Sequence, residues 1–345
     1  MTDALKPVLA TLAGGRTLTR PEAEAAFDLL LAGEATSAQM GAFLMGLRVR
    51  GETLDEITGA VAAMRARMLR VAAPAGAIDI VGTGGDGHGT YNVSTLAAMI
   101  VAACGVPVAK HGNRAASSRS GSSDVLAALG VAIGLGPSEV ERCLAEAGLG
   151  FMSAQTHHAA MRHFAAVRAD LGTRTIFNLL GPLSNPASVT RLLVGVFARE
   201  WLEPLARVLG ALGAQRAWLV HGADGLDELS TTGPSEVVAW ESGGLHRFTI
   251  APEDVGLPRA SLSDLKGGDA EHNAAALRGV LAGAPGPYRD IACLNAAAAL
   301  VVAGRADDLR AGLDMARAAL DTGRAREVLD RVVRVSKGAA LAAGG

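Results

Sequence analysis

Apolar residues in the first 70 positions follow a helical spacing. Runs such as Ala26-Phe27-Leu29-Leu30 and Phe43-Leu44-Leu47 place apolar side chains three and four positions apart, on one helix face. Each of three runs is preceded by a capping box, in which a threonine bonds the first turn and an acid or amide three residues later bonds back. With the run at 5–12, the pattern predicts four short helices; the boxes are Thr19–Glu22, Thr36–Gln39 and Thr53–Glu56.

From about residue 75 the pattern alternates between strands and helices. Helices are expected at 94–104 and from about 122, and the C-terminal third looks helical. Residues 234–250 are typical of a β-hairpin with Gly243-Gly244 at its turn. This alternation predicts an α/β sheet covered by helices. Short β-like runs occupy 78–81, 106–109, 192–197 and 217–220.

Composition narrows the class of protein. Half of the 345 residues are hydrophobic, enough for a sizeable core, and the formal net charge of −2 gives no sign of a nucleic-acid or membrane partner. No stretch of 18 apolar residues occurs, and the N-terminus lacks the basic flank and apolar run of a signal peptide. Three widely spaced cysteines predict reduced thiols in a cytoplasmic protein.

The most distinctive local feature is the glycine-rich stretch 81–90, VGTGGDGHGT, between an expected strand and an expected helix. Glycines allow a tight turn and bring backbone N–H groups close to an anion. Gly82, Gly84 and Gly87 fit the dinucleotide pattern G-x-G-x-x-G. That site needs the helix directly after the motif and an acid about 20 residues further on, and neither is present. The P-loop pattern is also absent.

The stretch after the glycines contains no acidic residue until Asp124. Its charged side chains are Lys110, Arg114 and Arg119, and they are accompanied by many serines, threonines and asparagines. Many donors without carboxylates suit a polyphosphate ligand, because charge-assisted hydrogen bonds to phosphate are strong. A polar surface loop is the simpler alternative at this point.

Six motifs in order carry a resemblance to the anthranilate phosphoribosyltransferase family. They cover nearly the whole chain, and together they are far more specific than any one alone. The motifs are GTGGDG with NVST (92–95), KHGNR (110–114), SGSSD (120–124), HHAAMRHFAAVRADLGTRTIFNLLGPLSNPA (157–187), HG with GLDELS (221–230) and RDIACLNAAAAL (289–300).

The resemblance implies a fold and a reaction. The fold would be that of type-III phosphoribosyltransferases and nucleoside phosphorylases: a small helical domain at 1–70, with a helical segment near 165–185 packed on it, and an α/β domain with a mixed sheet at 71–345. The reaction would transfer phosphoribose from 5-phosphoribosyl 1-pyrophosphate to the amine of anthranilate, in tryptophan biosynthesis. The family further implies Mg²⁺ and a homodimer that associates through the helical domain.

The resemblance also assigns roles to residues. His111, Asn113 and Arg168 would form the catalytic, acceptor-side group, in which Arg168 offers a two-pronged partner for the anthranilate carboxylate. Ser94, Asp227 and Glu228 would organise Mg²⁺, which favours one or two carboxylates plus phosphate oxygens. The phosphoribosyl pyrophosphate site would comprise Gly82, Gly85, Asp86, Thr90, Asn92, Val93, Ser94, Thr95, Lys110, His111, Gly112, Asn113, Arg114, Ala115, Ala116, Ser117, Ser118 and Ser122.

One segment departs from the family pattern. An aromatic-Ala-Pro turn before the histidine pair, and a proline after it, are usual, but residues 151–159 read FMSAQTHHA. We expect this change to bear on the acceptor and not on the phosphate ligands. His157, His158 and His163 are interpreted as packing or cleft-wall residues, because their spacing does not suit a shared metal.

Two other functions fit parts of the chain. A pyrimidine-nucleoside phosphorylase shares the fold, but it carries a Lys-His-Ser-Thr-Gly-Gly-type loop where this chain has Gly-Thr-Gly-Gly-Asp. A nucleic-acid-binding paralogue should show a basic stripe and a high isoelectric point, and this chain has one near 6.5.

Overall fold

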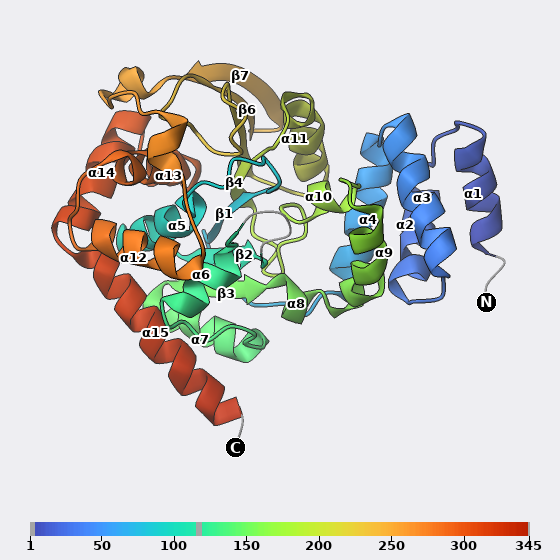
Figure 1. Ribbon diagram of the computed structural model, residues 1–345, viewed down its shortest axis with the longest axis horizontal. Coiled ribbons are helices and arrows are strands. Elements are labelled where there is room, and N and C mark those ends of the chain that lie inside the picture. The colour runs from blue at the N-terminus through green and yellow to red at the C-terminus, as the bar shows by residue number, and fades with distance from the viewer. Residues whose placement is uncertain (1–3, 115–118, 344–345) are drawn as a thin grey trace.

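The computed structural model describes residues 4–114 and 119–343. Figure 1 shows a small helical lobe beside a larger lobe built on a sheet, with the long C-terminal helix along the far edge of the larger lobe. The small lobe begins with four helices, as its apolar spacing predicts: α1 (Leu5–Ala13), α2 (Arg20–Leu31), α3 (Ser37–Arg50) and α4 (Leu54–Arg67).

The three predicted capping boxes are confirmed, and each begins its helix at the expected residue. The amide of Thr19 donates to Glu22 (2.8 Å), and that of Thr36 donates to Gln39 (3.0 Å). Glu56 does more than close the third box. It is fully buried, accepts from the amides of Thr53 and Leu18, and pairs with Arg50. This carboxylate therefore ties three helices of the lobe together.

The larger lobe holds one mixed seven-stranded sheet in the order β3-β2-β1-β4-β5-β6-β7. The first five strands in this order are parallel, and β6 and β7 are antiparallel to their neighbours. The strands are β1 (Ile78–Gly82), β2 (Val108–Gly112), β3 (Leu149–Ser153), β4 (Arg191–Gly195), β5 (Arg216–Gly222), β6 (Ser235–Glu241) and β7 (Gly244–Ile250).

Three sequence expectations need correction. The strand expected at 106–109 begins at Val108, after Pro107, whose ring nitrogen has no N–H for a ladder. Strand β3 was not predicted, because it is short and contains Gly150. Glycine is needed there because a Cβ would lie 2.7 Å from Leu144 of helix α7 (Pro137–Ala147). The hairpin turn is Ser242-Gly243, because both residues have positive φ as in a two-residue type I′ turn.

Both faces of the parallel part of the sheet are buried, each against a different set of helices, whereas the edge strand β7 is largely exposed. Leu193 of β4 faces the core formed with α5, α13 and α15, whereas Leu192 and Val194 face the core shared with α11 and the small lobe. This alternation follows from the two-residue period of a strand. The small lobe therefore packs on the sheet through one continuous core. The remaining helices are α5 (Val93–Ala103), α6 (Ser122–Ala128), α7 (Pro137–Ala147), α8 (Ala154–His157), α9 (Ala165–Leu171), α10 (Phe177–Leu180), α11 (Leu202–Ala211), α12 (Ala270–Leu281), α13 (Pro287–Val302), α14 (Leu309–Asp321) and α15 (Arg324–Ala343).

Cysteines and helix lengths add two observations. All three cysteines are buried free thiols, in agreement with the reduced thiols expected from their wide spacing. Among the described residues, no helix is both long and apolar enough to cross a membrane.

Candidate active site

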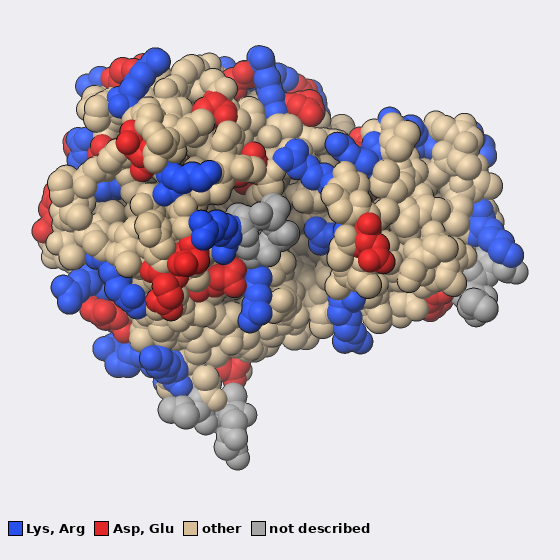
Figure 2. All heavy atoms as spheres, viewed as in Figure 1, with Lys and Arg blue, Asp and Glu red and all other residues tan. Residues whose placement is uncertain are grey.

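The carboxyl ends of β1 and β4 mark the candidate site. The chain passes from β1 outward to β2 and β3, and then returns to β4 on the other side of β1. The side on which strands are added therefore changes between β1 and β4, although these two strands are parallel. Ligands of open α/β sheets bind outside the strand ends at such a point. Figure 2 shows the surface hollowed between the two lobes, with Lys and Arg side chains at its borders.

The glycine-rich loop follows β1 and is fastened at its base. The Thr83 amide donates to Gly195 O at the end of β4 (2.9 Å), and the Gly84 amide donates to Asp227 Oδ2 (2.7 Å). A Cβ on Gly82 would lie 2.4 Å from that carboxylate oxygen. Glycine is therefore required at Gly82 for the close approach of the 227–228 loop.

The outer part of the same loop is held by the segment before α12. Gly267 donates to Gly89 O (2.9 Å), Lys266 Nζ donates to His88 O (3.1 Å), and Thr90 bridges to Lys266. On the opposite side the guanidinium of Arg174 donates to Gly85 O and stacks on Phe197. These contacts use carbonyl groups of the loop and not its amides.

The N-terminus of α5 brings donors and acids together. The helix begins at Val93, and the Ser94 amide donates to Glu228 Oε1 (3.2 Å). The Ser94 hydroxyl oxygen accepts from Lys110 Nζ (3.2 Å). Free N–H groups and the helix dipole make this end favourable for anions. Val93 and Thr95 are buried, and the Thr95 hydroxyl has no hydrogen-bond partner among the described residues.

Three carboxylates interact with one another at this point, those of Asp86, Asp227 and Glu228. Burial raises the pKa of Asp227 to about 7, and the neighbouring Asp86 charge adds to the shift. Burial and the charge of Asp227 raise the pKa of Glu228 well above its usual value. A cation bound here would relieve this repulsion.

The donor set fits Mg²⁺ in chemistry. Two carboxylates and the Ser94 hydroxyl supply hard oxygen ligands, which Mg²⁺ prefers. Within the described parts of the chain, no three acidic, histidine or cysteine side chains converge as a self-sufficient metal cage. A metal at Asp227 and Glu228 would therefore need further oxygens, such as those of a substrate phosphate.

Lys110 and His111 are neighbours on β2, and their side chains point to opposite faces of the strand. Lys110 is 2% exposed, and its Nζ donates to Ile80 O (2.6 Å). Burial lowers the pKa of Lys110, while the negative charges of Asp79 and Glu228 act in the opposite direction. The lysine thus lies between β1 and the acid cluster, on the side of the glycine loop.

His111 is held as a neutral imidazole. Burial, followed by the neighbouring His158, lowers its pKa to about 3. Its Nδ1 lies 3.1 Å from Gly181 O; a carbonyl only accepts, so Nδ1 carries the proton. Nε2 is then an acceptor, and it is buried with no partner among the described residues. A buried acceptor without a partner is a place for a ligand N–H or a water.

Arg168 lies on α9, which packs on α3 of the small lobe. Its guanidinium is half-buried over the Phe177 ring, 5.5 Å from the ring centre. No carboxylate of the described residues pairs with it, and no hydrogen bond ties it to the donor group. The structure thus brings the other predicted groups together directly and places Arg168 on a separate wall.

The loop after β2 is partly described. Asn113 O accepts from the Ser122 hydroxyl (3.2 Å) and from the Ser123 amide (3.2 Å), which returns the loop to the start of α6. A Cβ on Gly112 would lie 2.3 Å from the Ser122 oxygen, so glycine is required there. The predicted ligands Ala115, Ala116, Ser117 and Ser118 lie outside the described residues.

Residues 151–159, which differ from the family pattern, form the end of β3 and helix α8. His157 and His158 are buried, with His157 Nδ1 at 3.1 Å from Ser153 O and His158 Nε2 at 2.9 Å from Ser184 O. Burial lowers the pKa of His158 to about 4. These two histidines serve in packing, as interpreted from their spacing.

Several residues that support the site were not identified from the sequence. Asn273 and Tyr288 hold Asn92, through a side-chain bond of 3.0 Å and a bond to its carbonyl of 3.2 Å. Asp79 and Asn185 hold His111 and its surroundings. Only Asp79 carried a signal, since an acid within the buried run Ile78-Asp79-Ile80-Val81 requires a partner.

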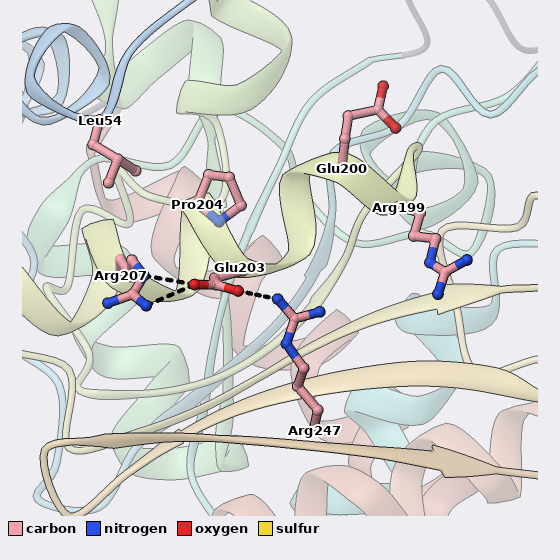
Figure 3. Close-up of a pocket in the computed structure, with 7 residues that line it drawn as sticks. All are labelled: Leu54, Arg199, Glu200, Glu203, Pro204, Arg207 and Arg247. Carbon is pink, nitrogen blue, oxygen red and sulfur yellow. Dashed lines mark hydrogen bonds and ion pairs between the residues drawn. The ribbon is translucent and has the colours of Figure 1, made fainter.

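A groove of about 550 Å³ lies elsewhere, where α4, α11 and β7 meet. Figure 3 shows Arg207 and Arg247 both directed at Glu203, so its main charges are already paired. It contains none of the predicted site residues; its lining is Leu54, Arg199, Glu200, Glu203, Pro204, Arg207 and Arg247.

Comparison with known proteins agrees with both lobes. Residues 6–68 match the helical bundle domain of a glycosyl transferase family, and residues 75–326 match its α/β domain. A helical bundle packed on an α/β domain, with a glycine loop and paired acids at the strand ends, therefore defines the chain as a transferase of this glycosyl transferase class.

Closer relatives specify the member. The anthranilate phosphoribosyltransferase of Methylocella silvestris is 69% identical over 341 residues, 99% of this chain and 98% of the relative. That of Beijerinckia indica is 67% identical, covering 97% of this chain and 98% of the relative. The chain belongs to the anthranilate phosphoribosyltransferase family. This degree of identity favours the anthranilate enzyme over the phosphorylase and over the nucleic-acid-binding alternative.

Solved structures agree. The enzyme of Thermus thermophilus superposes with a TM-score of 0.90 at 46% identity, covering 97% of this chain and all of that one. The enzyme of Saccharomyces cerevisiae in complex with phosphoribosyl pyrophosphate and Mg superposes with a TM-score of 0.91 at 27% identity, covering 98% and 99%.

Proposed function

We propose that this chain transfers the phosphoribosyl group from 5-phosphoribosyl 1-pyrophosphate to the amine of anthranilate, giving N-(5-phosphoribosyl)anthranilate and pyrophosphate in tryptophan biosynthesis. The observation that carries the proposal is the meeting of the glycine loop, the α5 N-terminus and the Asp227–Glu228 pair at the carboxyl ends of β1 and β4. A neutral imidazole with a free acceptor lies on the adjacent strand.

The donor would bind along the glycine loop. Its phosphates would accept hydrogen bonds from loop amides and from the α5 N-terminus, with Lys110 and Arg114 supplying positive charge. The full proposed donor set is the one that the family resemblance assigns. The yeast relative solved with phosphoribosyl pyrophosphate and Mg supports this placement, since its chain follows the same fold.

Mg²⁺ is the proposed cofactor, held by Asp227, Glu228 and Ser94. When bound, it would neutralise charge on the pyrophosphate leaving group. The protein's own part is to hold the two carboxylates in place, through the Gly84 and Ser94 amides.

Anthranilate would bind between the lobes, near His111, Asn113 and Arg168. Arg168 would pair with the carboxylate, since it has a half-buried guanidinium and no acidic partner among the described residues. A yeast relative, 26% identical, was solved with 4-fluoroanthranilate, which supports an aromatic acceptor of this type.

The reaction depends more on the placement of the two substrates and on stabilisation of the leaving group's charge than on a strong base. The amine nitrogen attacks C1 of the ribose as the bond to pyrophosphate breaks, through a transition state that resembles an oxocarbenium ion. The nitrogen then loses one proton, to solvent or to the released pyrophosphate. An aryl amine is neutral at pH 7 and is already nucleophilic. His111 Nε2 can accept a hydrogen bond from the amine and orient its lone pair toward C1, which lowers the barrier through orientation.

We also propose an organisation for the chain. The helical domain spans 1–70, with the segment near 165–185 packed on it, and the α/β domain spans 71–345. Two copies would associate through their helical domains, where Val49 is 80% exposed on α3. The buried free thiols suit a reducing cytoplasm. Sedimentation at micromolar concentration tests the dimer: a single monomeric species would contradict it.

The first experiment follows the loss of anthranilate fluorescence with purified protein, phosphoribosyl pyrophosphate and Mg²⁺. We expect turnover that EDTA abolishes and added Mg²⁺ restores. Binding of the donor without consumption of anthranilate would retain the donor site and reject the acceptor. No binding of the donor by folded protein would reject the proposed reaction.

A further inference from the structure

Strands β1 and β2 lie side by side but are scarcely paired. The β1–β4 ladder runs from Ile78 to Gly82, whereas the β1–β2 ladder registers only Ile78 with Val108. Beyond that pair, side chains replace the ladder. The His111 amide donates to Asp79 Oδ1 (3.1 Å), and Lys110 Nζ donates to Ile80 O.

Asp79 therefore acts as a spacer inside the sheet. It is fully buried, and its other oxygen, Oδ2, accepts from Asn185 Nδ2 (2.7 Å). The same Asn185 amide group donates to Ala109 O (2.9 Å), and Asn185 Oδ1 accepts from the Ala187 amide (2.8 Å). A buried carboxylate is costly unless it is bonded in this way. Asp79 thus joins β1, β2 and the segment 181–187.

Carbonyl groups of that segment bond two histidines from other parts of the chain. Gly181 O accepts from His111 Nδ1, and Ser184 O lies at hydrogen-bond distance from His158 Nε2. The rings of the two histidines are 5.1 Å apart. Asp79 consequently fixes His111 twice: directly at its amide, and through Asn185 at the segment that holds its imidazole.

We propose that Asp79 is a positioning residue for the acceptor half of the site, which sets the orientation of His111 through Asn185 and the opened β1–β2 ladder. It touches neither substrate. The inference rests on the proposed function, since it takes the His111 wall as the place of the amine acceptor.

Asp79→Asn is the informative variant, because it keeps the size of the side chain. Its amide can satisfy either the His111 amide or Asn185, but not both. We expect the KM for anthranilate to rise about tenfold or more, the scale of one lost hydrogen bond to a charged group, with the KM for phosphoribosyl pyrophosphate changed less than about threefold.

The double variant Asp79→Asn/Asn185→Asp exchanges the two groups. It restores a donor–acceptor pair between positions 79 and 185 and leaves an acceptor for the His111 amide, but it also replaces the donor to Ala109 O by an acceptor, so we expect only partial recovery of the anthranilate KM. Ser336→Ala is the control: this buried serine of α15 accepts from the Ala132 amide (3.1 Å) and has no bond to Asp79, Asn185 or His111, so its loss should affect stability only.

Two readouts are independent of turnover. In ¹⁵N-labelled protein, the His111 amide should exchange faster in Asp79→Asn, and its imidazole should lose the single Nδ1–H tautomer. Equal changes in both KM values, or an unaltered His111, would each overturn the positioning role. If wild-type protein consumed no anthranilate, the proposed reaction would be rejected. The amide exchange and the imidazole tautomer of His111 would still test whether Asp79 positions His111.

Discussion

At the scale of single residues, burial decides which chemical form a side chain takes. His111 is a general-acid or base candidate by type, yet its surroundings hold it neutral with the proton on Nδ1. Arg168 is the opposite case. It keeps its charge, rests on Phe177, and has no acidic partner among the described residues, so it is available to a carboxylate ligand.

Arg168→Ala should weaken the use of anthranilate by about 1.5–3 kcal/mol in kcat/KM, the scale of hydrogen bonds to a charged group. The kinetics of phosphoribosyl pyrophosphate should change little. Arg162→Ala is the matched control, since Arg162 is exposed on the turn just before α9. An equal loss for both substrates would speak against a carboxylate-binding role.

At the scale of elements, the loops that follow the parallel strands form the site together. The loop after β1 and the loop after β5 are joined by the Gly84–Asp227 bond, so neither has its shape without the other. The segment before α10 contributes Arg174, whose guanidinium holds the Gly85 carbonyl. Each loop thereby supplies candidate ligands and also supports its neighbour.

Asp227→Asn should raise the Mg²⁺ concentration for half-maximal rate about tenfold or more, a loss of about 1.4 kcal/mol or more in metal binding. The amide oxygen can still accept from Gly84, so the loop should remain folded. Asp224→Asn is the control in the same loop, because Asp224 bonds Ser230 and Thr232 and has no part in the metal set. An unchanged Mg²⁺ titration would remove Asp227 from the metal role.

Arg174→Ala should raise the KM for phosphoribosyl pyrophosphate by about three- to tenfold, since the glycine loop loses one charge-assisted bond at Gly85. Titration of the donor by calorimetry should give the same loss. Arg199→Ala, which removes an exposed arginine paired with Glu236, is the control. Donor affinity equal to wild type would show that the loop holds its shape without Arg174.

At the scale of the whole molecule, the second core joins the small lobe to the sheet. Side chains from α2, α3 and α4 share that core with α11 and with alternate residues of β4 and β5. Folding of the small lobe and closure of one face of the sheet are therefore coupled. The same burial encloses several titratable groups, so global stability should depend on pH.

The contribution of His111 and His158 to the free energy of unfolding should fall as the pH drops from about 6.5 to about 4. His111 and His158 have folded pKa values of about 3 and about 4, below the unfolded value of about 6.5, so the unfolded chain binds more protons in this range. Stability from these groups is complete above about 6.5. The buried acids Asp79, Asp227 and Glu228 act oppositely, because burial raises their pKa values and so favours the folded state as the pH falls.

Denaturant unfolding of His158→Gln against wild type isolates one of these groups. Glutamine can still donate to Ser184 O but takes up no proton. The variant should therefore lose less stability on acidification, by about 1.4 kcal/mol per pH unit in that window. Parallel curves for the two proteins would show that His158 is protonated in the folded state.

Much of the fold and part of the site could be predicted from local signals. The helical lobe followed from apolar spacing and capping boxes, because a helix start depends on neighbours within one turn. The glycine loop could be read as an anion cradle for the same reason. Strand β3 and the limits of β2 could not, since pairing and packing against α7 decide them.

The sequence by itself determined the order of elements, the glycine loop and the membership of a family. It also determined the stretch of hydrogen-bond donors without acidic residues that follows the glycine loop. Only the tertiary structure decided which distant residues meet. Asp227 approaches Gly84 across 143 positions, and Asp79 meets Asn185 across 106. The physical reason is that burial and hydrogen-bond partners, which set the charge of Asp79 and the tautomer of His111, come from segments far apart in the chain.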